Sequence, residues 1–334
     1  MAKTRLRLKA SIKRRSKKSA LVVFVITIAI VINAYFGVLI LFKGPSQAFS
    51  NLMISTFMET RRGKAVIKMI FSDEEIEQIT SKNNVFISNE ITNYTEDEFV
   101  IDPELKDKID VIDVSGATFK GKMMIVYDPS RIHLGVNSDL DSENLAGHYV
   151  EEYVSFLGGI GGINAGGFDD PGGKGDGSIP QGIVIKDGEI IFGNVNTYDS
   201  IIGFNKHNRL VVGQMTGGQA LEYGLVDAVT FGPPLIINYE PQSIMGTGGG
   251  LNPRTVIGQR EDGAVLLLVI DGRQTTSLGA TYLDCIELML DYGAMNAANL
   301  DGGHSSCMVY EGAIINNVVS LYGERAVPTA WVVK

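Results

Sequence analysis

The segment Leu21–Phe42 constrains this chain more than any other feature, because it runs for 22 residues without a charged side chain. A helix needs about 20 such residues to cross the hydrocarbon core of a bilayer. Nine of residues 1–20 are lysine or arginine and none is acidic, whereas only Lys43 follows before the Gly-Pro pair at 44–45. Because positively charged flanks stay in the cytoplasm, we expect a single-pass membrane protein with a cytoplasmic N-terminus and an extracytoplasmic C-terminal domain.

Two other interpretations of this segment stay open. A cleaved signal peptide has an apolar region of about 7–15 residues, and no small-x-small site clearly ends this longer run. A buried core helix would leave the nine flanking cations without a role. The favoured organisation is a basic cytoplasmic tail (1–20), a transmembrane helix (21–42), a membrane-proximal helical stalk and linker (43–108) and a C-terminal domain (109–334).

The charge of the remaining chain limits its partners. Residues 21–334 hold 20 basic and 38 acidic residues, so nucleic acid is excluded as a favoured partner. Two cysteines, Cys285 and Cys307, would face an oxidising compartment. They are either a disulfide or two buried thiols, and their spacing alone does not decide between these. The sequence gives no indication of the oligomeric state.

The pattern of elements changes at about residue 109. Before it, mixed polarity over 46–70 favours helix, Ser72 and Glu75 form a capping box, and 82–105 is polar and irregular. After it, short β-branched runs alternate with Gly, Pro and Asp, which is typical of strands. The expected strands include 111–114, 122–127, 182–185, 190–192, 210–214, 228–231, 265–270 and 297–300, and the clearest helices are Leu145–Phe156 and Thr281–Tyr292. The predicted fold class is α+β, a mixed β-sheet domain with flanking helices, preceded by one N-terminal transmembrane helix.

Four clusters of polar residues and glycine each end an apolar run. Such clusters suit a site where backbone must approach a ligand closely, although a single Asp-Gly cluster is equally a plain turn. The clusters are 161–169, 252–258, 269–273 and 299–306.

These clusters resemble the motifs of the phosphodiester glycosidase family, whose members split a sugar from a phosphodiester. The matching segments occur in the family's order from Asn164–Phe168 through Pro253–Gly258, Asp271–Arg273 and Asn299–Ser306 to Glu324–Pro328. The resemblance covers about residues 109–334 and leaves 1–108 uncovered. Two positions depart from the family pattern: Asp169 replaces a second aromatic residue, and His304 replaces a glycine. The substrate therefore does not follow from the resemblance.

The chemistry of a phosphodiester agrees with the residues in these motifs. The diester carries a permanent negative charge, which arginine holds with a planar pair of donors. A glycine-rich loop with hydroxyls suits an anion-binding nest, and glycosidic cleavage uses carboxylates beside the scissile bond. The candidate catalytic residues are Asp271, Asp301 and Glu324. The candidate substrate- and phosphate-binding residues are Asn164, Arg254, Thr255, Arg273, Gly302, Gly303, His304, Ser305, Ser306 and Arg325.

Other site types fit the sequence less well. Gly303–Cys307 lacks the final glycine of a nucleophile elbow, and no histidine follows His304, which disfavours a serine hydrolase. No Walker A motif is present. Asp169, Asp170 and Asp176 lack EF-hand spacing, so no cofactor is certain, although a divalent cation such as calcium stays open. The segment Gly246–Gly250 is expected to be a mobile loop near the site.

Together these features predict a membrane-anchored extracytoplasmic hydrolase. Its substrate would be a carbohydrate phosphodiester, cleaved at the glycosidic bond, in a cell-envelope glycopolymer or exopolysaccharide. The alternative is a non-catalytic glycopolymer-binding or assembly protein on the same fold.

Overall fold

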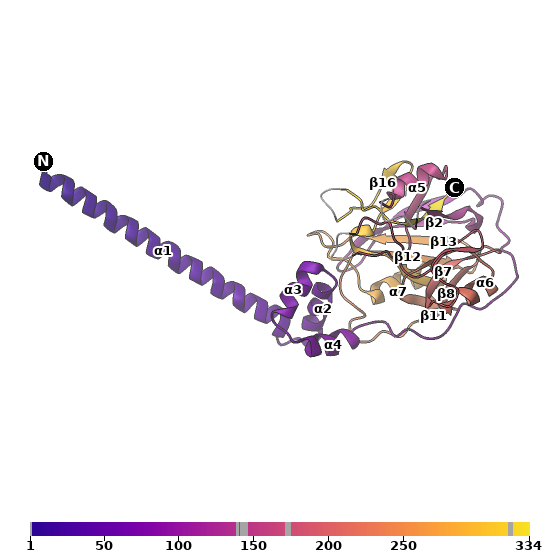
Figure 1. The fold of residues 1–334 in the computed structure, drawn as a ribbon, viewed down its shortest axis with the longest axis horizontal. Helices are drawn as coiled ribbons and strands as arrows, with labels where there is room; N and C mark the ends of the chain where they lie inside the picture. Colours follow the sequence, from indigo (N-terminus) through magenta and orange to yellow (C-terminus); the bar gives the residue numbers. More distant parts are fainter. Residues whose placement is uncertain (1, 138–139, 141–145, 171–174, 320–322) are drawn as a thin grey trace. The chain divides into compact units, whose positions relative to one another are not determined.

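A computed structural model describes residues 2–137, 140, 146–170, 175–319 and 323–334, with side chains described from residue 19 onward. The chain divides into two compact units, Met1–Met53 and Ile54–Lys334. In the first unit, α1 (Ala2–Lys43) contains the stretch Ser19–Lys43, which is long and apolar enough to cross a membrane. This agrees with the predicted membrane-spanning helix (Figure 1).

Three short helices follow: α2 (Gln47–Met58), α3 (Arg61–Lys68) and α4 (Asp73–Ser81). The predicted capping box is confirmed at the start of α4. Ser72 Oγ accepts the backbone N–H of Glu75, and the Glu75 carboxylate accepts the backbone N–H of Ser72. Residues from 54 onward belong to the same compact unit as the C-terminal domain, so most of the segment expected as a stalk lies within that unit.

Among the described residues, the largest sheet has seven strands in the order β1-β2-β13-β12-β14-β10-β11, with antiparallel neighbours. These strands are β1 (Ile109–Ser115), β2 (Lys120–Val126), β10 (Pro234–Ile237), β11 (Glu240–Pro241), β12 (Arg254–Arg260), β13 (Val265–Ile270) and β14 (Ala294–Leu300). Every residue of β13 is buried, which explains why its sequence is continuously apolar rather than alternating.

Two further antiparallel sheets of five strands complete the described strands. One has the order β16-β15-β4-β17-β3 and the other the order β6-β5-β9-β7-β8. The first comprises β3 (Ile132–Val136), β4 (Gly161–Asn164), β15 (Met308–Tyr310), β16 (Ala313–Ile314) and β17 (Thr329–Val333). The second comprises β5 (Val184–Lys186), β6 (Glu189–Phe192), β7 (Tyr198–Asn205), β8 (Leu210–Thr216) and β9 (Leu225–Thr230).

The seven-stranded sheet has a hydrophobic core on each face. Val265, Leu267 and Val269 of β13 belong to the cluster that contains Trp331, whereas the alternate residues of this strand belong to the cluster that contains Met289 of α7 (Tyr282–Asp291). Alternation of side chains along a strand produces this division. Two shorter helices contact the five-stranded sheets: α5 (Val150–Phe156) lies against β4 and β17, and α6 (Gly217–Glu222) lies against β8 and β9. The predicted α+β fold with its N-terminal apolar helix is confirmed.

One helix begins later than expected. The helix expected from Leu145 begins at Val150, with Tyr149 as its N-cap; residue 145 itself lies outside the described residues. Of the two alternatives open for the cysteines, the structure has two free, buried thiols in different core clusters. The loop Gly246–Gly250 forms backbone hydrogen bonds within the loop region and to residues 83–84, and its mobility stays a prediction.

Candidate active site

A pocket of about 530 Å³ lies where the end of β14, the loop before β12 and the segment 54–84 meet. This volume suits a small ligand. Five residues predicted from the motifs line it, namely Arg254, Arg273, Asp301, Gly302 and Gly303. Four more lining residues belong to the clusters or the loop that the sequence analysis named, although they were not candidate site residues: Gly249, Asn252, Pro253 and Asn299. The sequence did not single out the others, which are Ser55, Met58, Glu59, Lys64, Thr80, Asn83, Asn84, Phe231 and Tyr282.

Asp301 follows directly after β14 and is one of two acidic residues that line the pocket among the described residues. Its carboxylate accepts the backbone N–H of Gly302 at 2.9 Å. Burial raises the pKa of Asp301 to about 6, although hydrogen bonds from Ser305 and Gly302 act in the opposite direction. A carboxyl group with a pKa near neutrality can change its protonation state at physiological pH, which is typical of a catalytic carboxylate.

Asn164 and Thr255 lie behind Asp301 and do not line the pocket. Asn164 ends β4 and is fully buried, as is Thr255 in β12. The Asn164 side-chain amide donates to the backbone carbonyl of Asp301, and its oxygen accepts Thr255 Oγ1 at 2.8 Å and the Cys307 N–H at 3.2 Å. The buried amide of β4 therefore connects Thr255 of β12 with Asp301, which follows β14, and with Cys307, which precedes β15.

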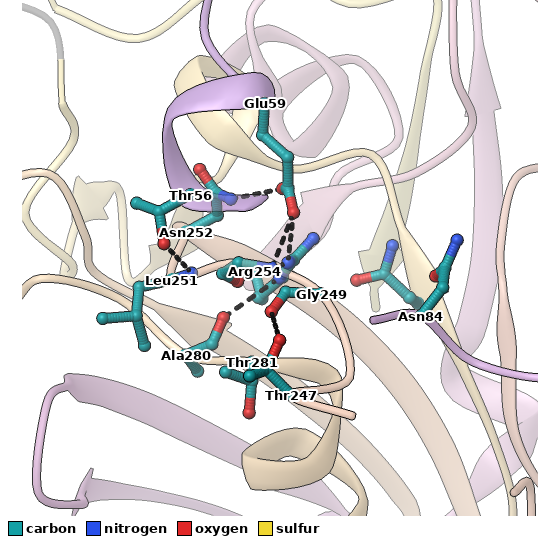
Figure 2. A network of polar contacts seen from close by, with 12 residues as sticks. Thr56, Glu59, Asn84, Thr247, Gly249, Leu251, Asn252, Arg254, Ala280 and Thr281 are labelled. Carbon is teal, nitrogen blue, oxygen red and sulfur yellow. Dashed lines mark hydrogen bonds and ion pairs between the residues drawn. The ribbon is translucent and has the colours of Figure 1, made fainter. Parts of the chain in front are cut away.

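Arg254 begins β12 and is buried, with 4% of its surface exposed. Its Nη2 donates to the carbonyl of Gly250 at 2.9 Å and to the carboxylate of Glu59 at 3.2 Å, and its Nε donates to the carbonyl of Ala280. The guanidinium also stacks over the ring of Tyr282 at 4.0 Å. Figure 2 shows Glu59 reaching Arg254 from the short helix above it. The charge of Arg254 is thus already balanced by a carboxylate.

Arg273 also lines the pocket, and among the described residues no carboxylate forms an ion pair with it. The same holds for Lys64, whose side chain is exposed. Its Nη2 and Nε donate to Asn252 Oδ1 at 3.0 and 3.3 Å, and its Nη1 lies 3.1 Å from His304 Nδ1. Burial lowers the pKa of His304, and the positive charge of Arg273 lowers it further. A neutral imidazole beside Arg273 leaves the guanidinium charge available to an anion.

Arg325 takes part in a different arrangement. Both terminal nitrogens donate to the Asp170 carboxylate, at 2.8 and 2.6 Å, and one also donates to the Gly175 carbonyl. The guanidinium stacks over Phe168 at 4.6 Å. These hydrogen bonds lower the pKa of Asp170. Arg325 does not line the pocket, and its charge is balanced by Asp170.

Two of the three candidate catalytic acids also lie away from the pocket. Asp271 accepts the backbone N–H and the side-chain amide of Asn317, each at 2.8 Å. Glu324 accepts the N–H of Val150 at 3.2 Å and lies 3.0 Å from the thiol of Cys307, and burial raises its pKa. Both carboxylates fasten loops, so Asp301 is the acid of this set that faces the pocket.

The two glycines of the Asp301 loop serve different purposes. Gly302 has an ordinary φ of −128°, but a Cβ there would lie 2.9 Å from the carbonyl oxygen of Pro253. Gly303 has a φ of +66°, which L side chains rarely adopt. Ser305 and Ser306 are buried after these glycines, and within the described residues Ser306 Oγ has no hydrogen-bond partner.

The alternative of a calcium site gains no support from the acids that suggested it. Asp170 is paired with Arg325, and Asp176 accepts hydrogen bonds from Ser178. Across the part of the chain that the structure describes, no group of three or more His, Cys, Asp or Glu side chains is placed to hold a metal ion.

The candidate site residues omitted two residues at the centre of the polar network, Glu59 and Asn252. Asn252 is the first residue of the cluster 252–258, so the sequence marked its neighbourhood but gave it no role. Glu59 lies almost 200 residues before its partners in a segment without a matching motif, so nothing in the local pattern pointed to it.

A model of the phosphodiester glycosidase family matches residues 158–334. The chain belongs to this family. The catalytic domain of zebrafish N-acetylglucosamine-1-phosphodiester alpha-N-acetylglucosaminidase, solved in a form auto-inhibited by its pro-peptide, has a similar fold, with a TM-score of 0.57 and 21% identity. The match covers 73% of this chain and 87% of the zebrafish domain.

A second relative is similar over a short region. The SPbeta prophage-derived uncharacterized protein YomE of Bacillus subtilis (strain 168) is 40% identical over 99 residues. That region is 28% of this chain and only 15% of YomE, so the likeness extends to a small part of the longer protein.

Proposed function

We propose that this member of the phosphodiester glycosidase family is a membrane-anchored extracytoplasmic hydrolase that cleaves the glycosidic bond of a sugar-1-phosphodiester. The observation that carries this proposal is the joint lining of one pocket by Asp301, with its raised pKa, and Arg273, which pairs with no carboxylate of the described residues. An anion such as a phosphodiester would meet Arg273, and the reacting sugar carbon would lie beside Asp301.

The roles of the remaining motif residues follow from their contacts. Asn164 and Thr255 would hold the Asp301 loop in place, and Gly302 and Gly303 would let its backbone turn at the pocket. Arg254 and Arg325 are already neutralised by carboxylates, so their contribution to phosphate binding would be indirect. Asp271 and Glu324 would stabilise neighbouring loops rather than take part in the reaction.

The mechanism we propose uses the ionised form of Asp301. A phosphate is a good leaving group, so little protonation is needed as the C–O bond breaks, and a carboxylate is better placed to stabilise positive charge at the sugar or to activate water. The basic N-terminal flank and the apolar helix would place this domain outside the cytoplasm, where cell-envelope glycopolymers or exopolysaccharides are the substrates we favour.

The test is turnover by the full-length protein in detergent. Incubation with sugar-1-phosphodiesters should release free sugar, and Asp301→Asn should abolish release while leaving the protein folded. Asp271→Asn is a matched comparison, because that carboxylate faces away from the pocket and its loss should act through stability alone. A parent protein that binds the diesters without releasing sugar would instead support the alternative, a non-catalytic glycopolymer-binding protein.

A further inference from the structure

The segment Ile54–Asn84 forms one side of the pocket, although it lies outside the region that matches the family. Backbone hydrogen bonds join it to the loop before β12. Met245 N donates to the Asn84 carbonyl at 2.8 Å, and Gly249 N donates to the Asn83 carbonyl at 2.9 Å. The segment is therefore fixed against the site at the level of the backbone.

The glycines of the facing loop permit this close packing. A Cβ on Gly250 would lie 2.4 Å from the backbone nitrogen of Thr56, and a Cβ on Gly246 would lie 2.5 Å from the carbonyl oxygen of Lys82. Any other residue at these positions would push the segment away. The pocket of about 530 Å³ exists with the segment in this position, so the segment lines the pocket without filling it.

Glu59 makes three polar side-chain contacts to the loop and to the start of β12. Its Oε1 accepts the N–H of Gly250 at 3.1 Å and the Nη2 of Arg254 at 3.2 Å. Its Oε2 accepts the side-chain amide of Asn252. Figure 2 shows Asn252 and Arg254 meeting the carboxylate of Glu59, beside the bond from Leu251 N to Thr56 Oγ1.

The side chain of Asn252 lies between Glu59 and Arg273 and forms hydrogen bonds with both. A side-chain amide has a donor end and an acceptor end, so the contact of its nitrogen with Glu59 directs its oxygen the other way. That oxygen accepts both Nε and Nη2 of Arg273. Arg273 in turn lies against His304. Arg273 Nη2 also donates to the backbone carbonyl of Glu59 at 3.4 Å. The Glu59 carboxylate itself is connected to the Arg273 guanidinium through the side chain of Asn252.

We propose that Glu59 is a positioning residue of the substrate site, which through Asn252 orients Arg273 to receive the phosphate. This inference rests on the proposed function, because it takes the anion bound by Arg273 to be the phosphate of a sugar-1-phosphodiester. It makes the membrane-proximal segment a part of the active site rather than a spacer.

The experiment compares the full-length parent with Glu59→Gln in detergent. The probe is a sugar-1-phosphodiester, with binding measured by calorimetry and turnover by release of sugar. Glu59→Gln should raise Kd and KM by about tenfold, the effect of losing one charge-assisted hydrogen bond, while kcat changes less. Glu77→Gln is the matched control, because Glu77 is exposed on α4 and lies outside the pocket.

A second variant keeps the test decisive if Glu59→Gln fails to fold. Asn252→Asp preserves the size of the side chain but replaces the nitrogen that donates to Glu59 with an oxygen. The new carboxylate would also pair with Arg273. This variant should therefore weaken binding of the diester at least as strongly as Glu59→Gln. Loss of binding in this variant together with normal binding in Glu77→Gln would support the relay.

Four outcomes separate this inference from the proposed function. Unchanged Kd and KM in Glu59→Gln would overturn the positioning role alone. Tighter binding or faster turnover in that variant would also overturn it, by showing that the segment obstructs the pocket. Binding by the parent without turnover would reject the hydrolase while the Kd values still decide on Glu59, and a parent that binds no diester would reject both.

Discussion

At the scale of single residues, the site depends on which charges are already balanced. Arg254 and Arg325 resemble Arg273 in the sequence motifs, but each is paired with a carboxylate, Glu59 or Asp170. Arg273 has amide and imidazole partners instead, so its charge remains available to a ligand. Position separates Asp301 from the other two candidate acids, because of the three it is the one that lines the pocket.

The pH dependence of activity should report Asp301. If the ionised carboxylate is the active form, kcat/KM should fall as the pH drops through about 6 and reach a plateau above it. Measurement of kcat/KM of the full-length protein between pH 4.5 and 8.5, a range that brackets this pKa, checks the prediction. A rate that instead falls as the pH rises through 6 would assign Asp301 the role of a general acid.

The same pKa shift makes a prediction about stability. A carboxyl group whose pKa is higher in the folded state stabilises the fold only while it is protonated, so this contribution is lost as the pH rises through about 6. Asp301→Asn removes the buried charge and should melt at the same temperature as the parent or higher at pH 8. A lower melting temperature of Asp301→Asn than of the parent at pH 8 would contradict this prediction, by showing that the ionised Asp301 carboxylate stabilises the loop 301–306.

The arginines should differ in their response to lysine. Arg273→Lys replaces a planar pair of donors with a point charge and should weaken diester binding by roughly ten- to a hundredfold, or about 1.5–3 kcal/mol. Arg325→Lys, in a pair outside the pocket, should change binding much less. Calorimetric titration of both variants tests this, and equal losses would place the phosphate nearer to Arg325 than the pocket implies.

Among the secondary-structure elements, the end of β14, the loop before β12 and the segment 54–84 meet at the site. The turn after β14 carries Asp301, the loop before β12 carries Asn252, and the helix ending at Met58 brings Glu59 to them. Besides their polar contacts, the loop before β12 and the segment 54–84 approach closely at glycines of the loop. A steric change at one glycine should therefore disturb the site without touching a polar group.

Gly250→Ala provides that change. Its Cβ would meet the backbone of Thr56 at about 2.4 Å, so the segment must shift, at a cost of about 1–3 kcal/mol and with weaker diester binding. Gly218→Ala in α6 is the control, since its nearest contact is an ordinary 3.6 Å and alanine favours helix. Thermal unfolding and calorimetry on both variants would contradict this packing if they behaved alike.

At the scale of the whole molecule, the sequence predicts regular structure well and long-range partners poorly. Apolar runs and capping residues located β13, α7 and the capping box at Ser72, because these depend on neighbouring residues. Motif order brought Arg273 and Asp301 to one candidate site. The contact between Glu59 and Asn252 spans 193 positions and follows from tertiary packing alone, so no local pattern could reveal it.

Membrane topology belongs to the same scale. The basic flank before the apolar span predicts that the N-terminus stays inside, so a reporter fused after Lys334 should show activity only as an exported protein. Replacing the nine basic residues of 1–20 with glutamine should reduce or reverse that outcome. Reporter activity in the cytoplasm with the natural flank would contradict the predicted orientation.

Isotope transfer from water shows which bond of the diester is cleaved. Full-length protein is incubated with a sugar-1-phosphodiester in water enriched in oxygen-18, and the masses of the products are measured by mass spectrometry. Cleavage of the glycosidic C–O bond should place the label in the released sugar and leave the phosphomonoester unlabelled, with no release by Asp301→Asn. Label in the phosphomonoester would instead show attack at phosphorus and would reject glycosidic cleavage.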